Sequence, residues 1–166
     1  MTRVQVHLVE AALLALLPGR LQASYGRRVD VKTISSKDFD DAGQLILQPP
    51  CVRIHFDRAS YGATRDIQRT ALNAELQFSF LCFDESLKSR GDERTKTLTL
   101  VAVVQNELAG ARLQLEPGVY TEPILLTAVE QAQDLIGPVD ECYAVVAMIP
   151  GLAQFTGPNA NFGVRG

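Results

Sequence analysis

Three side chains that can bind metal ions or move protons occupy alternate positions of one apolar segment. In the run Cys51-Val-Arg-Ile-His-Phe-Asp57, even spacings separate Cys51, His55 and Asp57, so a β-strand would turn all three to one face. Thiolate, imidazole and carboxylate groups are the ligands that zinc takes in proteins. Residues so close on one strand seldom converge on one ion without ligands from elsewhere. We therefore expect a half-covered strand face here and no metal site.

The known motifs of catalysis and nucleotide binding are absent from the sequence. It contains no G-x-S-x-G, no G-x-x-x-x-G-K-[ST], no strand-linked G-x-G-x-x-G and no H-E-x-x-H. The pair His7 and Glu10 at helical spacing, and the pair Asp40-Asp41, are typical of solvated surfaces. A Ser–His–Asp triad stays open, because its members need not be neighbours in the sequence. With no positive sign of catalysis, we expect no catalytic residue, no cofactor and no metal.

A group of arginines surrounds a tyrosine directly after this segment. Arg58, Arg65 and Arg69 flank Tyr61, and arginines in such a group can contact phosphates. Neighbouring aspartates offset much of the positive charge. Arginine and tyrosine are also enriched at the hot spots of protein interfaces. We rank protein contact first, a solvated loop second and nucleic-acid binding third.

Length and composition favour one globular domain. A chain of 166 residues can bury roughly 68–70% of its unfolded surface, and 46% of these residues are hydrophobic. The 16 Lys and Arg against 19 Asp and Glu give a net charge of −3, which disfavours disorder and a basic nucleic-acid binder. No apolar run reaches the roughly 18 residues of a membrane span. Three widely spaced cysteines in apolar surroundings are typical of assembly in a reducing cytoplasm.

The first expected element is an apolar helix over residues 3–17, which Pro18-Gly19 should end. Apolar residues widen its hydrophobic side so far that only a few positions are clearly polar. A helix of this kind is covered on most sides, by its own domain or by a neighbouring subunit. Leu8 and Leu13 on this helix are therefore candidate subunit contacts.

The middle of the chain predicts strands. Residues 28–35 alternate as a half-buried strand, and a loop follows over 36–44. The segment Cys51–Asp57 is a second strand, and residues 72–83 carry the strongest period-two pattern of the chain. The last two strands predict a long antiparallel hairpin, joined by a connection over 58–70. Loops of that length are usually functional or mobile.

A helical pattern begins at Asp92 and closes at Ala109-Gly110. Leu113 and Leu115 then begin a short extended piece, which Pro117-Gly118 breaks.

The last third of the chain is more ambiguous. Residues 123–136 fit a helix or a strand, and periodicity does not decide between them. The segment Glu141–Met148 is a buried strand that should end at Pro150-Gly151. We expect one domain over residues 1–153, followed by a Gly-, Asn- and Pro-rich extension over 154–166.

This order of elements, with the apolar helix Val4–Leu17 and the segments Cys51–Asp57 and Leu72–Phe83, resembles the Mu-like family of phage tail terminator proteins. The later segments Glu122–Val129 and Cys142–Val146 are similar to the closing strand pair of that family. The resemblance covers most of the chain, and it assigns residues 123–129 to a strand.

The resemblance implies an α+β fold, a small α/β sandwich with a mostly antiparallel sheet and helices on one face. It implies a hexameric ring that caps the completed tail tube, ends the polymerisation of tube and sheath, and offers a surface for joining the head. Its partners would be further copies of itself, the tail tube protein, the tail sheath protein and a head-completion or neck protein. DNA would pass through the lumen without sequence-specific binding. The location would be the neck end of the virion tail, after assembly in the host cytoplasm, with no membrane partner and no catalytic residues.

Two other classes of function stay open. One is another structural protein of the phage particle, from head completion, the neck or the baseplate. The other is a small α+β binding or enzyme domain, which needs a deep pocket with convergent polar groups.

Overall fold

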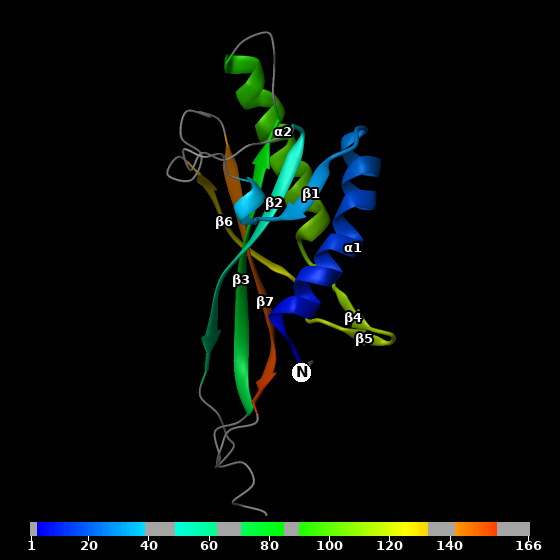
Figure 1. The fold of residues 1–166 in the computed structure, drawn as a ribbon, viewed down its shortest axis with the longest axis vertical. Helices are drawn as coiled ribbons and strands as arrows, with labels where there is room; N and C mark the ends of the chain where they lie inside the picture. Colours follow the sequence, from blue (N-terminus) through cyan, green and yellow to red (C-terminus); the bar gives the residue numbers. More distant parts are fainter. Residues whose placement is uncertain (1–2, 39–48, 63–70, 85–89, 133–141, 156–166) are drawn as a thin grey trace, which may run out of the picture.

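The strand with the strongest alternation, β3 (Ala71–Phe83), lies at the centre of a five-stranded sheet (Figure 1). The computed structural model describes residues 3–38, 49–62, 71–84, 90–132 and 142–155. The sheet order is β1-β2-β3-β7-β6, in which the other strands are β1 (Asp30–Thr33), β2 (Cys51–Tyr61), β6 (Leu125–Gln131) and β7 (Tyr143–Gln154). Among the neighbouring strands that the structure describes in this sheet, the pair β1–β2 is parallel and the other three pairs are antiparallel. The predicted β2–β3 hairpin is confirmed.

Two helices, α1 (Val6–Tyr25) and α2 (Arg90–Leu108), cover one face of this sheet (Figure 1). Alternate residues of β3, among them Leu76, Phe78 and Phe80, point to this face and are buried. They join buried residues of both helices in one hydrophobic core. The α+β class, with the N-terminal and central helices on one face of a mostly antiparallel sheet, is therefore confirmed.

Helix α1 continues well past Pro18, which corrects the predicted end at Pro18-Gly19. Val9, Leu13, Leu17 and Leu21 recur every fourth residue and are fully buried. A proline inside a helix costs about 3 kcal/mol, whereas each buried leucine contributes about 1.5–3 kcal/mol, so burial on both sides of Pro18 keeps the helix intact. The helix ends at Gly26, whose φ of 74° suits glycine and whose N–H donates to the Gln22 carbonyl at 3.1 Å.

The length of α1 also corrects the expectation about membrane spans. By length and composition alone, Val6–Tyr25 would suffice to cross a membrane. Core helices pass the same test, and here the Val9–Leu21 stripe packs in the hydrophobic core. The absence of a membrane partner stays a prediction.

Two strands are longer than predicted, because β3 offers them partners along its whole length. Strand β2 includes Arg58–Tyr61, which the sequence assigned to a loop, and Tyr61 pairs with Ala74. Strand β7 runs through Pro150-Gly151 to Gln154, which pairs with Ala71. Proline is tolerated there because β6 pairs with β7 only as far as Met148. Pro150 therefore lies on an edge of the sheet.

The remaining elements are short. A 3-10 turn, η1 (Ser36–Asp38), follows β1, and β4 (Gln114–Glu116) pairs with β5 (Val119–Tyr120) across a turn in which Gly118 has a φ of 76°. Strand β6 confirms the strand that the family resemblance assigned and that periodicity left open.

Three strands extend beyond the part of the sheet that has five. Strand β1 pairs only as far as Ile54, and β6 only as far as Met148. We call the remaining three-stranded extension the arm; it consists of residues 58–61, 71–76 and 149–154. In Figure 1 it forms the lower, narrower part of the molecule, and its inner face still packs in the hydrophobic core, where Leu76, Ile149 and Ala153 are buried.

Candidate functional site

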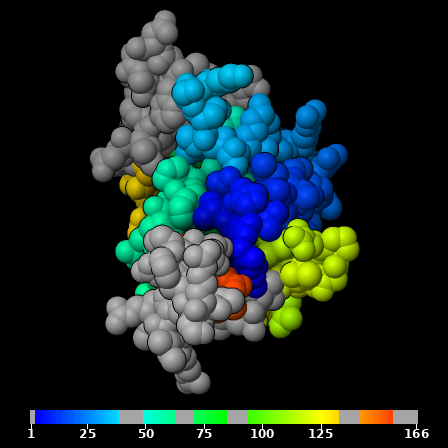
Figure 2. All heavy atoms as spheres, turned by 60° about the horizontal axis from the view of Figure 1, so that its bottom comes forward, coloured from blue at the N-terminus to red at the C-terminus, as the bar shows by residue number. Residues whose placement is uncertain are grey.

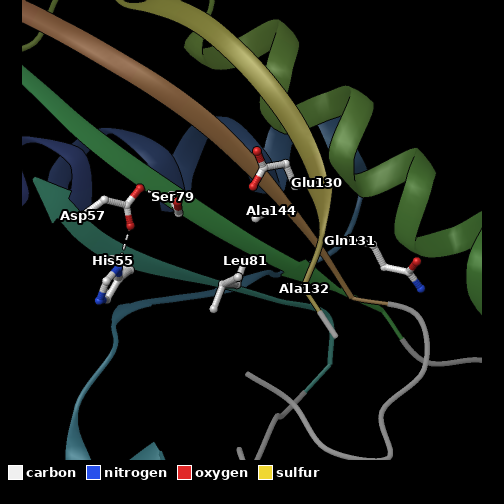
Figure 3. A pocket seen from close by; sticks show the side chains of 8 residues that line it. All are labelled: His55, Asp57, Ser79, Leu81, Glu130, Gln131, Ala132 and Ala144. Carbon is white, nitrogen blue, oxygen red and sulfur yellow. Dashed lines mark hydrogen bonds and ion pairs between the residues drawn. The ribbon is translucent and has the colours of Figure 1, made fainter. Parts of the chain in front are cut away.

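The sheet face opposite the helices holds a pocket of about 320 Å³ (Figure 3). Its polar lining includes His55 and Asp57 from β2, Ser79 from β3 and Glu130 from β6, while Leu81 and Ala144 provide apolar lining. His55 and Ser79 are direct cross-strand partners. The β-bulge between Phe56 and Arg58 leaves Asp57 outside the ladder of paired residues, so its carboxylate is free to reach across to β3.

Asp57 is the centre of the hydrogen bonds in this pocket. Its Oδ1 lies 2.7 Å from His55 Nδ1, while its Oδ2 accepts hydrogen bonds from Ser79 Oγ at 2.6 Å and from Gln77 Nε2 at 3.2 Å. Gln77 in turn accepts a hydrogen bond from Arg58 Nε at 3.3 Å. Both carboxylate oxygens are therefore occupied by side chains of the sheet.

This arrangement differs from a catalytic triad, although it contains the three residue types. In a triad the histidine lies between the serine and the aspartate and takes the serine proton. Here Asp57 lies between Ser79 and His55, and the Ser79 hydroxyl donates to the carboxylate. An aspartate in that place does not activate the serine, so the geometry fits a structural polar cluster.

The metal reading of Cys51, His55 and Asp57 finds no geometric support. Cys51 is fully buried with Leu81 and Phe83 in a second small core, whereas the His55 side chain is 52% exposed. Across the described ranges, no three His, Cys, Asp or Glu side chains are grouped to hold an ion. The pair Asp40-Asp41 lies outside the described residues.

Arg53 is a buried cation that fixes one end of the sheet. Its side chain is 3% exposed, and it donates to the Asp30 carboxylate at 2.8 Å and to the Asp30 carbonyl at 2.9 Å. Its Nε lies 3.5 Å from Asp38 Oδ1. One guanidinium thus ties β1 and η1 to β2.

Asp84 has the same role at the end of β3. Its buried carboxylate accepts hydrogen bonds from the Tyr25 hydroxyl and from Arg27 at 3.1 Å, and its backbone exchanges two hydrogen bonds with Thr97. The end of α1 and the middle of α2 are therefore held to β3. Burial, and then the hydrogen bond to Asp84, raise the pKa of Tyr25.

A second surface lies where the arm meets the start of α1. A groove of about 400 Å³ is lined by Tyr61, Leu76 and Phe155 of the arm side and by Val4 and His7 of the N-terminal side. The Tyr61 and Phe155 rings stack edge-on, 5.6 Å apart, yet remain 50% and 48% exposed. Figure 2 brings this end forward and shows the start of the chain between β2 and the β4–β5 hairpin.

The six candidate contact residues differ in their exposure to solvent and in whether the structure describes them. Arg58 and Tyr61 are exposed side chains of the arm. Leu8 is half-buried, and Leu13 is fully buried in the subunit's own core, which removes Leu13 from the contact surface. Arg65 and Arg69 lie outside the described residues.

Other residues of these surfaces escaped the sequence analysis. Phe155 falls in the segment assigned to the C-terminal extension, and Ser79 and Gln77 looked like ordinary outward positions of a strand. Only the strand register, which places Ser79 beside His55, shows that they meet Asp57.

Comparisons with known proteins give a likeness among solved structures. The sequence matches no protein-family model and no curated protein. Among solved structures it is similar to a chain in the virion of a native gene transfer agent particle, with 14% sequence identity and a TM-score of 0.48, over 89% of this chain and 95% of that chain.

Replacing Arg53 should loosen the β1 end of the sheet. We expect Arg53→Met to lower the free energy of unfolding by about 2–4 kcal/mol, because Asp30 and Asp38 lose their buried partner. Lys32→Met is the matched control, since Lys32 also lies 3.5 Å from Asp30 but its side chain is 59% exposed, and we expect a loss of about 1 kcal/mol or less. Urea titration measures both, and equal losses would contradict the role of Arg53.

The buried cysteines should make the protein sensitive to alkali. Burial raises the pKa of the Cys51 thiol from 9.0 to about 12, and it also raises those of Cys82 and Cys142. Between these pH values the unfolded chain releases protons that the native chain keeps, so the stability that is complete below pH 9 falls as the pH rises. We expect the Tm to decline from pH 8 to pH 10.5, by roughly 2–4 °C for each kcal/mol lost.

Thermal denaturation of wild type and Cys51→Ala over this pH range is the measurement. The variant should show a shallower decline, because it has one buried thiol fewer. An identical decline in both proteins would show that the Cys51 thiol is not the cause.

Proposed function

We propose that this protein is a structural virion protein that forms a hexameric ring on the end of a phage tail tube. The ring ends the polymerisation of the tube and the sheath and forms the surface that joins the head. The observation that carries the proposal is the arm, a three-stranded extension whose inner face packs in the hydrophobic core and which presents exposed aromatic and arginine side chains. The resemblance in the order of elements supports the same function.

The arm suits contact with the end of a tube. Tyr61 and Phe155 present an apolar surface on one face of the arm, and Arg58, three residues before Tyr61, lies on the opposite face, where it donates to Gln77. Exposed aromatic residues and arginine are the side chains that contribute most to protein interfaces. Because strands β2, β3 and β7 are paired throughout the arm, it meets a partner as a preformed element with little ordering cost.

The polar pocket supports a structural function over a catalytic one. Its carboxylate is saturated by His55, Ser79 and Gln77, so it holds no activated nucleophile. A net charge of −3 also suits a ring through which DNA slides, since strong attraction to phosphates would slow its passage. Another place in the particle, at head completion, the neck or the baseplate, would use the same features with a different stoichiometry.

The stoichiometry of the assembly tests the proposal directly. We expect light scattering over a concentration series to give a hexamer, or a monomer that becomes a six-membered ring when tail tubes are added. A monomer or dimer at all concentrations that ignores tail tubes would contradict the proposal. A ring of another number would favour a different position in the particle.

A substitution on the arm tests its contact with the tube. We expect Tyr61→Ser to raise the protein concentration needed to stop tube growth by about 30-fold or more, the effect of losing a hot-spot side chain. Tube lengths in electron micrographs measure it. Tyr120→Ser is the matched control, because Tyr120 is 48% exposed but lies on β5, away from the arm. Equal effects of the two substitutions would remove the arm from the contact.

A further inference from the structure

Within the described residues, the two outer strands of the sheet each leave one edge without a strand partner. Among the strands that the structure describes, β1 pairs only with β2 and β6 only with β7. Exposed edges of this kind are templates for pairing with another chain. The β6 edge also carries apolar side chains in solvent, since Leu125 is 50% and Val129 is 41% exposed.

The two edges carry opposite charge. From Leu113 to Ala132 the chain has three glutamates and neither a basic residue nor an aspartate, and Glu130 on β6 is exposed. Around β1 the exposed charged residues are cations: Arg28, Lys32 and Lys37. The carboxylates nearby, Asp30 and Asp38, are both bound by the buried Arg53, and Asp30 also lies 3.5 Å from Lys32.

The side chains of the two edges also match by face. Lys32 pairs with Arg53 and Glu130 pairs with Ala144, so both lie on the face of the polar pocket. Thr33 pairs with Ile54 and Val129 pairs with Val145, so both lie on the helix-covered face. A joined sheet would therefore place Lys32 beside Glu130 and Thr33 beside Val129 with no mismatch between faces.

We propose that copies of this chain join head to tail, with β6 of one copy paired to β1 of the next. The strand order and directions make β1 and β6 run oppositely, so a neighbour related by rotation about an axis along the strands pairs in the antiparallel sense. Such a heterologous contact closes into a ring when the rotations between successive copies add up to a full turn, and continues as a filament when they do not. Closure at six copies rests on the proposed function, whereas the pairing of the edges does not.

The charges favour head-to-tail pairing of β6 with β1 over a symmetric dimer in which two β6 strands pair. If two β6 edges met, Glu130 of each copy would find no cation on the facing strand, because Leu125–Gln131 contains no basic residue. Pairing of β6 with β1 brings Glu130 to Lys32 instead. Because β1 has only four residues, the ladder is short, and contact between two copies is weak until the ring closes.

Engineered cysteines test the pairing. The variant Thr33→Cys/Val129→Cys keeps both edge charges, and antiparallel neighbours bring the Cα atoms within the range of a disulfide. The three native cysteines are buried and stay outside the reaction. We expect oxidation to give a ladder of covalent multimers on a denaturing gel, and neither single variant to give one. The exposed pair Ala23→Cys/Asn106→Cys on the helices is the control.

Charge reversal in the same background tests the register. We expect Glu130→Lys to slow cross-linking by about threefold to tenfold, because it places like charges opposite one another. Adding Lys32→Glu should restore the rate. Thermal denaturation of each variant verifies that the fold is retained.

The outcomes separate this inference from the proposed function. A series of cross-linked multimers that ends at the hexamer supports both the edge pairing and the hexameric ring. A ladder that ends elsewhere or continues without limit supports the edge pairing and overturns the hexameric ring. No ladder, or dimers from a single variant, overturns the edge pairing; if wild type is then a hexamer by light scattering, the ring stands and uses another surface.

Discussion

Strand β3 is paired along nearly its whole length on both sides, and the rest of the structure depends on its register. Because side chains alternate with a period of two, a slip by one residue would turn Phe78 and Phe80 away from the helices and bring Gln77 and Ser79 into the core. The register keeps the large residues under α1 and α2. It also sets Ser79 beside His55 on the other face, where the Asp57 cluster forms.

Buried charged side chains fix the positions of elements that apolar packing alone does not determine. At one end of the sheet Arg53 binds two carboxylates and holds β1 in place; at the end of β3, Asp84 holds α1 and α2. A buried ion that loses its partner is costly, so these contacts define one position for each element. One guanidinium offsets one of the two carboxylate charges, and the exposed charged side chains beside them are cations, Arg28, Lys32 and Lys37.

The period-two and helical patterns predicted β2, β3 and α2, because burial of one face imposes those periods, whereas the two-layer fold was what the family resemblance implied. Local stop signals were wrong at Pro18 and Pro150, since long-range partners outweighed them: the buried leucines of α1 in one case and β3 in the other. The strand β6 needed the family resemblance, because its residues fit both periods. The Asp57 cluster joins residues about twenty positions apart through a bulge, and no local pattern encodes that contact.

The arm and the sheet edges are distinct surfaces, and this separation has a consequence for assembly. A ladder of four residues is short for a stable dimer, but copies bound side by side on a tube end are held at a high effective concentration, at which weak contacts close. The arm would then supply the contact with the tube, and the edges of the sheet would supply the contacts that close the ring. On the proposed function, the tube would then act as the template of its own cap, and rings would form where growth must stop.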